Sequence, residues 1–334
     1  MRYPWVAVCY FPTQVVLVDD DRHCLNPITR ALRLHQIACE VFEKPKKALK
    51  YFLDHYKPLT VFDHCLKTLV SCEYDKQSIT DHPINMDLPL LNQLLYQADR
   101  FTHISVAIID YALNEMNGLE LARELHHISN PLKKVMLTGQ ATKDIGLEGF
   151  TEGVLDMFIR KDLPDLTEYL CEMIPALQYR YFQELSQTIV KLLSLDNPCC
   201  LTDLGFIRFF ENLRKIKGFI EHYLLNDKGD FVFLTSQGKP AFLGVYTDQT
   251  LVDQYDWAIN QETVSDDVQQ ALKNKKGALF IYPESEGYPS DEKWDKILHP
   301  IQRIPQTPYY YALIEEYIYL ILIFFLFGLR QKYF

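Results

Sequence analysis

The stretch SVAIIDYALNEMNGLEL, Ser105 to Leu121, decides the fold of this chain. Four apolar residues, Val106 to Ile109, lead to a carboxylate at Asp110, and apolar residues recur at helical spacing after Gly118. The apolar run predicts a strand buried on both faces, and the later spacing predicts a helix packed against the sheet. We therefore expect Asp110 at the carboxyl end of a central parallel strand, where open α/β sheets bind ligands.

Three further apolar runs end in polar side chains. They are Gln14 to Val18, followed by Asp19, Asp20 and Asp21; Lys134 to Leu137, followed by Thr138; and Met157 to Arg160, followed by Lys161. Because the carboxyl ends of parallel strands share one edge of a sheet, we expect these side chains to meet. Such a set of carboxylates, hydroxyl and ammonium suits a divalent cation and a phosphoryl group.

These landmarks occur in the order found in a known family. The run VLVDDD, Asp110 with Gly118 eight positions later, Thr138 followed by Gly139, and Lys161 together resemble the receiver domain of two-component response regulators. The resemblance implies an α/β flavodoxin-like domain with a five-stranded parallel sheet. The alternative is a generic flavodoxin-like domain whose strand-end acids cap helices, but that alternative requires neither the threonine nor the lysine.

Two positions depart from the receiver pattern. Receivers usually have proline where Asn114 stands, and usually proline after the lysine, where this chain has Asp162. We interpret neither position as one that carries chemistry, and we expect altered loop stiffness without loss of function.

The resemblance also assigns roles to the acidic residues. Asp110 is the implied phosphoryl acceptor, which forms an acyl phosphate as other aspartyl nucleophiles do. Asp20 and Asp110 are the implied direct ligands of Mg²⁺, Asp19 binds it through water, and the backbone carbonyl of Ala112 completes the set. Asp21 is interpreted as a solvated residue at the start of a helix.

The remaining site residues concern the bound phosphate. Lys161 is implied to bind a phosphoryl oxygen, and Thr138 is implied to move and donate its hydroxyl to another. Phe158 occupies the position of the family's switch aromatic, although a plain role in the sheet core explains it equally well. Inward motion of an aromatic would change the receiver surface and hence dimerisation.

The receiver is predicted to span residues 13–165 and to be enlarged. Asp20 and Asp110 are 90 positions apart, far more than in ordinary receivers, so an insertion is placed at about 57–103. A structureless loop of that size is uncommon, so we expect a helical insertion, with patches at Val61 to Val70 and Leu88 to Ala98. A zinc site made by Asp63, His64, Cys65 and Cys72 is disfavoured because their spacing matches no common pattern.

Residues 166–198 are predicted to form a helical linker in which Pro175 kinks or splits the helix. Residues 199–334 are expected to form an α+β output domain. A helix over 204–213 precedes three antiparallel strands, at 219–225, 231–235 and 241–246, because the intervening turns contain Asn226, Gly229 and Gly238. Helices at 251–258, 264–273 and 291–298 and strands at 278–282 and 309–314 follow.

Composition limits the function classes. A net charge of −10 argues against a generally nucleic-acid-binding surface, and eight cysteines without a C-x-x-C pair indicate reduced thiols.

The amino terminus lacks the apolar region and cleavage site of a signal peptide, so we expect a cytoplasmic protein. The apolar segment Tyr317 to Leu329 is too short to span a bilayer as a helix. A buried strand or dimer helix is favoured there, with peripheral membrane contact as the alternative.

We therefore expect a response regulator that accepts a phosphoryl group from a sensor histidine kinase or phosphotransfer protein. Phosphorylation is expected to switch homodimerisation and the contacts of a non-enzymatic output domain. The insertion and the unusual output look most similar to the α-hydroxyketone quorum-sensing response regulators. One alternative is a DNA-binding regulator that uses two basic clusters, Arg208, Arg214, Lys215 and Lys217, and Lys273, Lys275 and Lys276. The other is a phosphate sink or scaffold.

Overall fold

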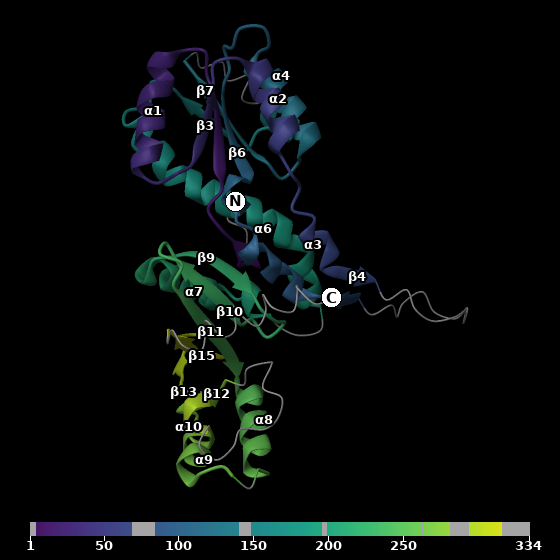
Figure 1. Cartoon of the computed structure of the whole chain (residues 1–334), viewed down its shortest axis with the longest axis vertical. Helices are drawn as coiled ribbons and strands as arrows, with labels where there is room; N and C mark the ends of the chain where they lie inside the picture. The colour runs from purple at the N-terminus through teal and green to yellow at the C-terminus, as the bar shows by residue number, and fades with distance from the viewer. Residues whose placement is uncertain are drawn as a thin grey trace, which may run out of the picture. The chain divides into compact units, whose positions relative to one another are not determined.

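The chain, seen here as a computed structural model, is described over residues 5–68, 84–139, 148–195, 199–261, 263–280 and 294–315. Its contacts divide it into two compact units (Figure 1). The parallel-sheet unit holds the described residues within 11–62 and 97–187. The antiparallel-sheet unit holds those within 1–10, 63–96 and 188–334. The linear domain boundaries expected from the sequence stay a prediction; the contacts group 1–10 and 63–96 with the C-terminal half.

A five-stranded parallel sheet forms the centre of the parallel-sheet unit. Its order is β3 (Cys39–Phe42), β2 (Gln14–Val18), β6 (Ile104–Asp110), β7 (Lys133–Thr138) and β8 (Met157–Arg160). Every neighbouring pair is parallel. All residues of β2, β6 and β7 are buried, which explains their unbroken apolar runs. The predicted flavodoxin-like sheet is confirmed.

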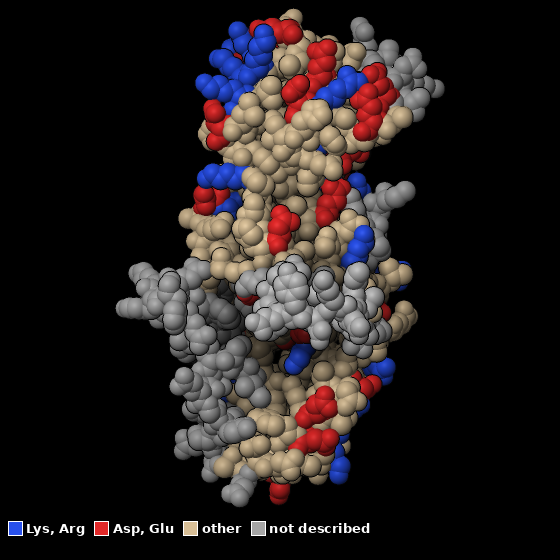
Figure 2. Space-filling model, turned by 90° about the vertical axis from the view of Figure 1, so that its right-hand side faces the viewer, with Lys and Arg blue, Asp and Glu red and all other residues tan. Residues whose placement is uncertain are grey.

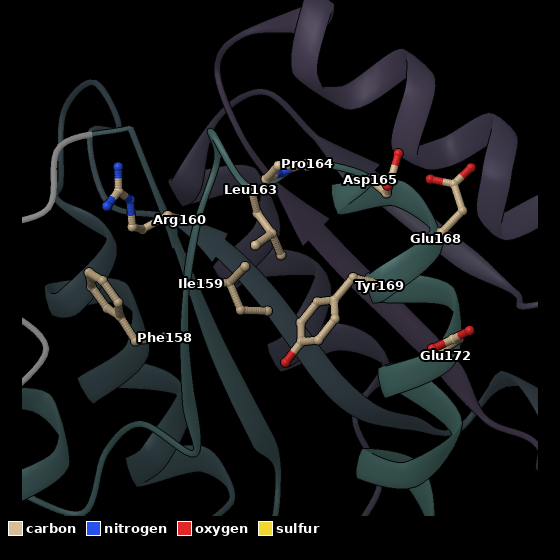
Figure 3. A pocket seen from close by; sticks show the side chains of 9 residues that line it. All are labelled: Phe158, Ile159, Arg160, Leu163, Pro164, Asp165, Glu168, Tyr169 and Glu172. Carbon is tan, nitrogen blue, oxygen red and sulfur yellow. The ribbon is translucent and has the colours of Figure 1, made fainter.

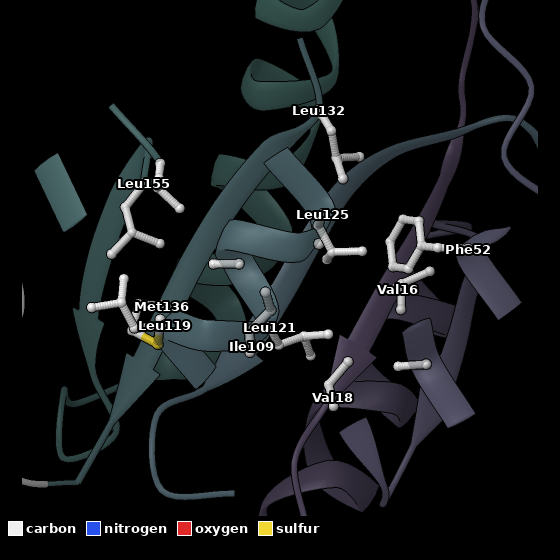
Figure 4. Packing of buried hydrophobic residues seen from close by; sticks show 14 of the residues in the cluster. Val16, Val18, Phe52, Ile109, Leu119, Leu121, Leu125, Leu132, Met136 and Leu155 are labelled. Atoms are coloured by element: carbon white, nitrogen blue, oxygen red, sulfur yellow. The ribbon is translucent and has the colours of Figure 1, made fainter. Parts of the chain in front are cut away.

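Helices cover both faces of this sheet. Val16 and Val18 pack with α2 (Pro45–His55) and α4 (Gly118–Ile128), in the core drawn in Figure 4. Val15 and Leu17 point to the other face, where they pack with α1 (Arg22–Leu34) and α6 (Leu166–Leu193). This alternation along one strand gives the sheet two separate cores, as the period of two in a strand requires.

The helix α6 corrects one of the two effects predicted for Pro175, the split, and the predicted kink stays a prediction. Pro175 does not split the segment, because α6 runs as one helix from Leu166 to Leu193 with the proline inside it. A proline inside a helix costs about 3 kcal/mol. Ile174 and Leu177 beside it are buried in the sheet core, and burying such side chains contributes about 1.5–3 kcal/mol each. Tertiary packing therefore outweighs the local penalty.

The insertion contains helices, as predicted, and also a strand pair that was not. Its described elements are α3 (Val61–His64), β4 (Leu66–Thr68), β5 (Ile84–Met86) and the 3₁₀ helices η1 (Leu88–Tyr96) and η2 (Arg100–Thr102). The expected helical patch at 61–70 was wrong over Leu66–Thr68, since β4 pairs antiparallel with β5, and residues 69–70 lie outside the described residues. A short apolar run does not distinguish strand from helix by periodicity alone.

The antiparallel-sheet unit is built on six strands. Their order is β1 (Cys9–Tyr10), β9 (Phe219–Leu224), β10 (Phe231–Thr235), β11 (Pro240–Thr247), β15 (Tyr309–Ile314) and β14 (Gln302–Arg303). The predicted meander is β9 to β11, and the pairing of β1 with β9 was not predicted. Helix α7 (Leu204–Lys217) contacts this sheet through Phe206 on Tyr309 and Phe210 on Phe231.

Smaller elements complete this unit. They are η3 (Cys200–Thr202), α8 (Asp248–Ile259), α9 (Asp266–Lys273), β12 (Gly277–Leu279), α10 (Trp294–Ile297) and β13 (Leu298–Pro300). Trp294 is the largest fully buried residue of the core that α8, α9, β12 and α10 share. The apolar segment 317–329 lies outside the described residues. A buried strand, a dimer helix and a peripheral membrane contact therefore all stay predictions for it. Among the helices that the structure describes, none combines the length and apolarity needed to cross a membrane.

Candidate functional site

The carboxyl edge of the parallel sheet holds an acidic cluster. Asp110 is the last residue of β6, and Asp19 directly follows the neighbouring strand β2. One carboxylate oxygen of each of Asp19, Asp20 and Asp110 lies within 4.8 Å of the others. These three residues, called the acidic cluster below, meet as the sequence predicted, although their chemical roles stay predictions.

Lys161 supplies the positive charge at this cluster. It directly follows β8, and its Nζ lies 2.7 Å from Oδ2 of Asp19 and 2.8 Å from Oδ1 of Asp110. The backbone N–H of Lys161 also donates to the backbone oxygen of Thr138, at 2.8 Å. The end of β7 therefore fixes the backbone from which the ammonium reaches two carboxylates.

The electrostatics of the cluster follow from burial and from this ammonium. Burial raises the pKa of Asp110 above its ordinary value; Lys161 opposes this rise, and the neighbouring Asp19 and Asp20 add to it. Burial lowers the pKa of Lys161, but its contacts with Asp110 and Asp19 outweigh burial, so the net direction is upward. Lys161 is therefore held charged, and its single ammonium contacts two of the three carboxylates of the cluster.

The donor set of the cluster fits a hard divalent cation. Carboxylate oxygens are the ligands that Mg²⁺ and Ca²⁺ prefer, and like charges this close are costly without a cation. A single lysine does not neutralise three carboxylates, so a cation would complete the charge balance. The acidic cluster is a site that can bind a metal ion.

The loop after Asp110 has its own local order. The backbone N–H of Gly118 donates to the backbone oxygen of Tyr111, at 2.9 Å, which closes the loop of residues 111–117. Asn117 caps α4, because its side chain accepts from the Glu120 N–H while the Glu120 side chain accepts from the Asn117 N–H. Ala112 lies in this loop and is exposed.

Three other predicted residues lie at or near this edge. Thr138 is the last residue of β7 and is 3% exposed. Asp21 caps α1 by accepting a hydrogen bond from the His23 N–H at 2.8 Å, which agrees with its interpretation as a helix-start residue. Phe158 is half-buried in β8 and packs against the core on the α2 and α4 side.

A pocket of about 630 Å³ opens beside Phe158. In Figure 3 the side chains of Phe158 and Ile159 point to opposite sides of the strand. The pocket is lined by Phe158, Ile159, Arg160, Leu163, Pro164, Asp165, Glu168, Tyr169 and Glu172. The contacts of Phe158 satisfy a core role, and its role as a switch stays a prediction.

Two residues at the site were missed by the sequence analysis. The Asn114 side-chain amide donates to Oδ2 of Asp20, so this position does contact the acidic cluster. Cys24, in α1, lies beside Asp19, and burial together with that carboxylate raises the pKa of its thiol to about 12. The only sequence signal for Asn114 was its position four residues after Asp110. No motif or spacing in the sequence pointed to Cys24.

The alternative zinc site gains no support. Over the described ranges, the acidic cluster is the only set of three or more His, Cys, Asp or Glu residues placed to share a metal ion. Asp63, His64 and Cys65 form no such set, and Cys72 lies outside the described residues.

Known proteins of solved structure are similar to this chain and indicate its class of protein. No protein-family profile matches the chain, and no curated protein matches it. The doubly wound parallel sheet with its acidic edge is the fold of response-regulator receivers, and the resemblance to response regulators is confirmed by a solved structure. That structure is the response regulator LqsR of Legionella pneumophila, 29% identical, with 94% of this chain and 91% of that chain covered and a TM-score of 0.75.

A second similar structure is shorter. The CheY-like receiver domain protein of Methanospirillum hungatei is 17% identical, with 52% of this chain and 98% of that chain covered and a TM-score of 0.34. The likeness to LqsR extends over both units, so the chain is similar to a response regulator over nearly its whole length.

Proposed function

We propose that this protein is the response regulator of a two-component phosphorelay and that Asp110 accepts its phosphoryl group. The observation that carries the proposal is the contact of Lys161 with both Asp19 and Asp110, beside Asp20, at the carboxyl edge of a parallel sheet. The donor is a phosphohistidine on a sensor kinase or phosphotransfer protein. The sequence resemblance to the α-hydroxyketone regulators supports a role in quorum sensing.

The transfer is a substitution at phosphorus. A carboxylate oxygen of Asp110 forms the new P–O bond while the P–N bond to the donor histidine breaks, and the electron pair of that bond stays on the imidazole. Asp110 is 3% exposed, which limits access of competing water. Positioning and neutralisation of charge are therefore the main tasks of the surrounding residues.

Lys161 and Thr138 serve those tasks. The Lys161 ammonium already lies 2.8 Å from Asp110 and would bind an oxygen of the phosphoryl group. Thr138, at the end of the neighbouring strand, would donate its hydroxyl to another oxygen. Asp19, Asp20, Asp110 and the carbonyl of Ala112 would hold Mg²⁺, which supplies neutralisation of the charge on the phosphoryl oxygens.

Charge pairing supports an output half that does not bind DNA. In the first basic cluster Lys217 pairs with Glu315 at 2.7 Å, and Arg214 stacks over Tyr10 at 4.6 Å. In the second, Lys275 pairs with Asp248. Figure 2 shows acidic and basic side chains interspersed over the face drawn. A protein or small-molecule interaction module, switched by dimerisation, is the output we propose; a cytoplasmic location stays a prediction.

The test uses the full chain and a small phosphodonor such as acetyl phosphate, with Mg²⁺. Intact mass should rise by one phosphoryl group in the wild type and stay unchanged in Asp110→Asn. Light scattering with beryllofluoride, a phosphate mimic, should show a change in mass that this variant lacks. A phosphorylated Asp110→Asn protein would refute the acceptor assignment. If the wild type is phosphorylated but its molar mass by light scattering does not change, only the proposed dimer switch is refuted.

A further inference from the structure

The three carboxylates of the acidic cluster have different partners within the chain. Lys161 contacts Asp19 and Asp110 but not Asp20 in the ion pairs described above. Asp20 instead accepts a hydrogen bond from the side-chain amide of Asn114 through Oδ2. The orientation of that amide is fixed by chemistry, because its carbonyl oxygen would repel a carboxylate whereas its NH₂ group donates to it.

An amide donor and a divalent cation compete for the same carboxylate oxygen. A cation attracts oxygen lone pairs and repels the partially positive hydrogens of an NH₂ group. The amide that faces Asp20 therefore makes Oδ2 a weaker ligand for a cation, and withdrawal of the amide would strengthen cation binding at this oxygen. Lys161 contacts Asp19 and Asp110 and not Asp20, so at the Asp20 carboxylate the competing donor is the Asn114 amide.

Asn114 also belongs to a loop with fixed ends. Residues 111–117 are closed by the hydrogen bond from Gly118 to Tyr111, and Glu115 pairs with Lys46 of α2 at 3.3 Å. Withdrawal of the Asn114 amide consequently changes the backbone conformation between the Gly118–Tyr111 hydrogen bond and the Glu115–Lys46 pair. Occupancy of the cluster and the conformation of the loop are thus linked, and linkage acts in both directions.

We propose that Asn114 is a positioning residue that fixes the orientation of the Asp20 carboxylate and lowers the affinity of the acidic cluster for divalent cations. This inference rests on the proposed function, since it concerns the cation that the cluster would hold. When Asn114 is released, cation binding changes the conformation of the loop of residues 111–117. The contact of this loop with α2 changes with it.

The first test is calorimetric titration of the full chain with MgCl₂. Asn114→Ala and Asn114→Leu each remove the amide, and Leu retains the bulk of the side chain. Both should bind Mg²⁺ about threefold to tenfold more tightly than the wild type, the range expected for loss of one hydrogen bond of ordinary strength at an exposed position. Asn130→Ala is the matched control, because it removes an exposed side-chain amide before the start of β7, away from the acidic cluster, and should leave the affinity unchanged.

A second readout separates competition from a general loosening of the loop. Hydrogen exchange of residues 111–117 should change on addition of Mg²⁺ in the wild type and should change less in Asn114→Ala, where the amide is already absent. Affinity that is equal or weaker in both Asn114 variants would overturn the inference, and weaker affinity would show that Asn114 helps to bind the cation.

The outcomes also distinguish this inference from the proposed function. Wild-type binding that is lost in Asp20→Asn, together with unchanged affinity in the Asn114 variants, refutes only the role of Asn114. A folded wild type that gives neither heat nor a change in hydrogen exchange with Mg²⁺, like Asp20→Asn, refutes the cation site and with it both proposals.

Discussion

A Cβ atom added to Gly118 would lie 2.1 Å from the backbone oxygen of Asp110. The obstacle is backbone and not a flexible side chain, so any larger residue must push the end of β6 away from the start of α4. The glycine that follows Asp110 by eight positions is therefore required by space, and its φ angle is not in the left-handed region.

We expect Gly118→Ala to lower the free energy of unfolding by about 2–3 kcal/mol, as overpacking against a fixed backbone does. The displacement falls on Asp110, so phosphorylation by acetyl phosphate should also slow. Urea unfolding measures the first effect. Gly139→Ala is the control, because no atom lies within 4 Å of its added Cβ. Equal stability of the two variants would contradict the steric argument.

We expect Lys161→Met to change two properties in opposite directions. Mg²⁺ should bind about tenfold more tightly, because a positive charge leaves the acidic cluster. The response to beryllofluoride should be lost, because the ammonium that faces the phosphoryl oxygen is gone. Titration and light scattering provide the two measurements.

Arg160→Met is the control for that experiment. Arg160 is the preceding residue, but its exposed guanidinium pairs with Asp162 and not with the acidic cluster. It should leave both properties near those of the wild type. Weaker Mg²⁺ binding in Lys161→Met would show that the lysine organises the carboxylates more than it repels the cation.

Buried His103 should make stability depend on pH. Its Nε2 lies 2.7 Å from the Tyr181 hydroxyl, and burial lowers its pKa to about 4. The unfolded chain binds this proton below pH ~6.5, whereas the folded chain does not until about pH 4, so stability is present at neutral pH and is lost as pH falls through that window. The loss should be about 3 kcal/mol at most.

His103→Gln should flatten this dependence between pH 7 and 4, measured by urea unfolding across the range. His222, which is buried and also has a lowered pKa, titrates in the same direction, so the difference between the two proteins is the relevant quantity. The same slope in the variant would show that His103 keeps its proton in the folded state.

The sheet edge was predictable from sequence because its strands are buried on both faces. A run such as Val106 to Ile109 leaves little choice of structure, and in a parallel sheet the residue after it falls at the ligand-binding edge. Asp110, Asp19 and Lys161 were therefore placed together correctly before any contact was known.

What the sequence did not reveal depends on contacts between distant residues. The two-residue strand β1 has no periodicity, and only its pairing with β9 defines it. The strand β4 follows the short helix α3 and takes its form from β5. The Asn114 contact depends on the path of a loop, and the continuity of α6 through Pro175 depends on packing against the sheet.

The pairing of Cys9–Tyr10 with Phe219–Leu224 has a consequence for synthesis of the chain. Strand β1 leaves the ribosome before the strands of the parallel sheet, yet its partner β9 follows only after that whole sheet has been translated. At ~5–20 residues per second this delay is on the order of ten to forty seconds. During that time Cys9–Tyr10 has no strand to pair with, so the antiparallel sheet gains its first strand in sequence only after the parallel sheet has been made.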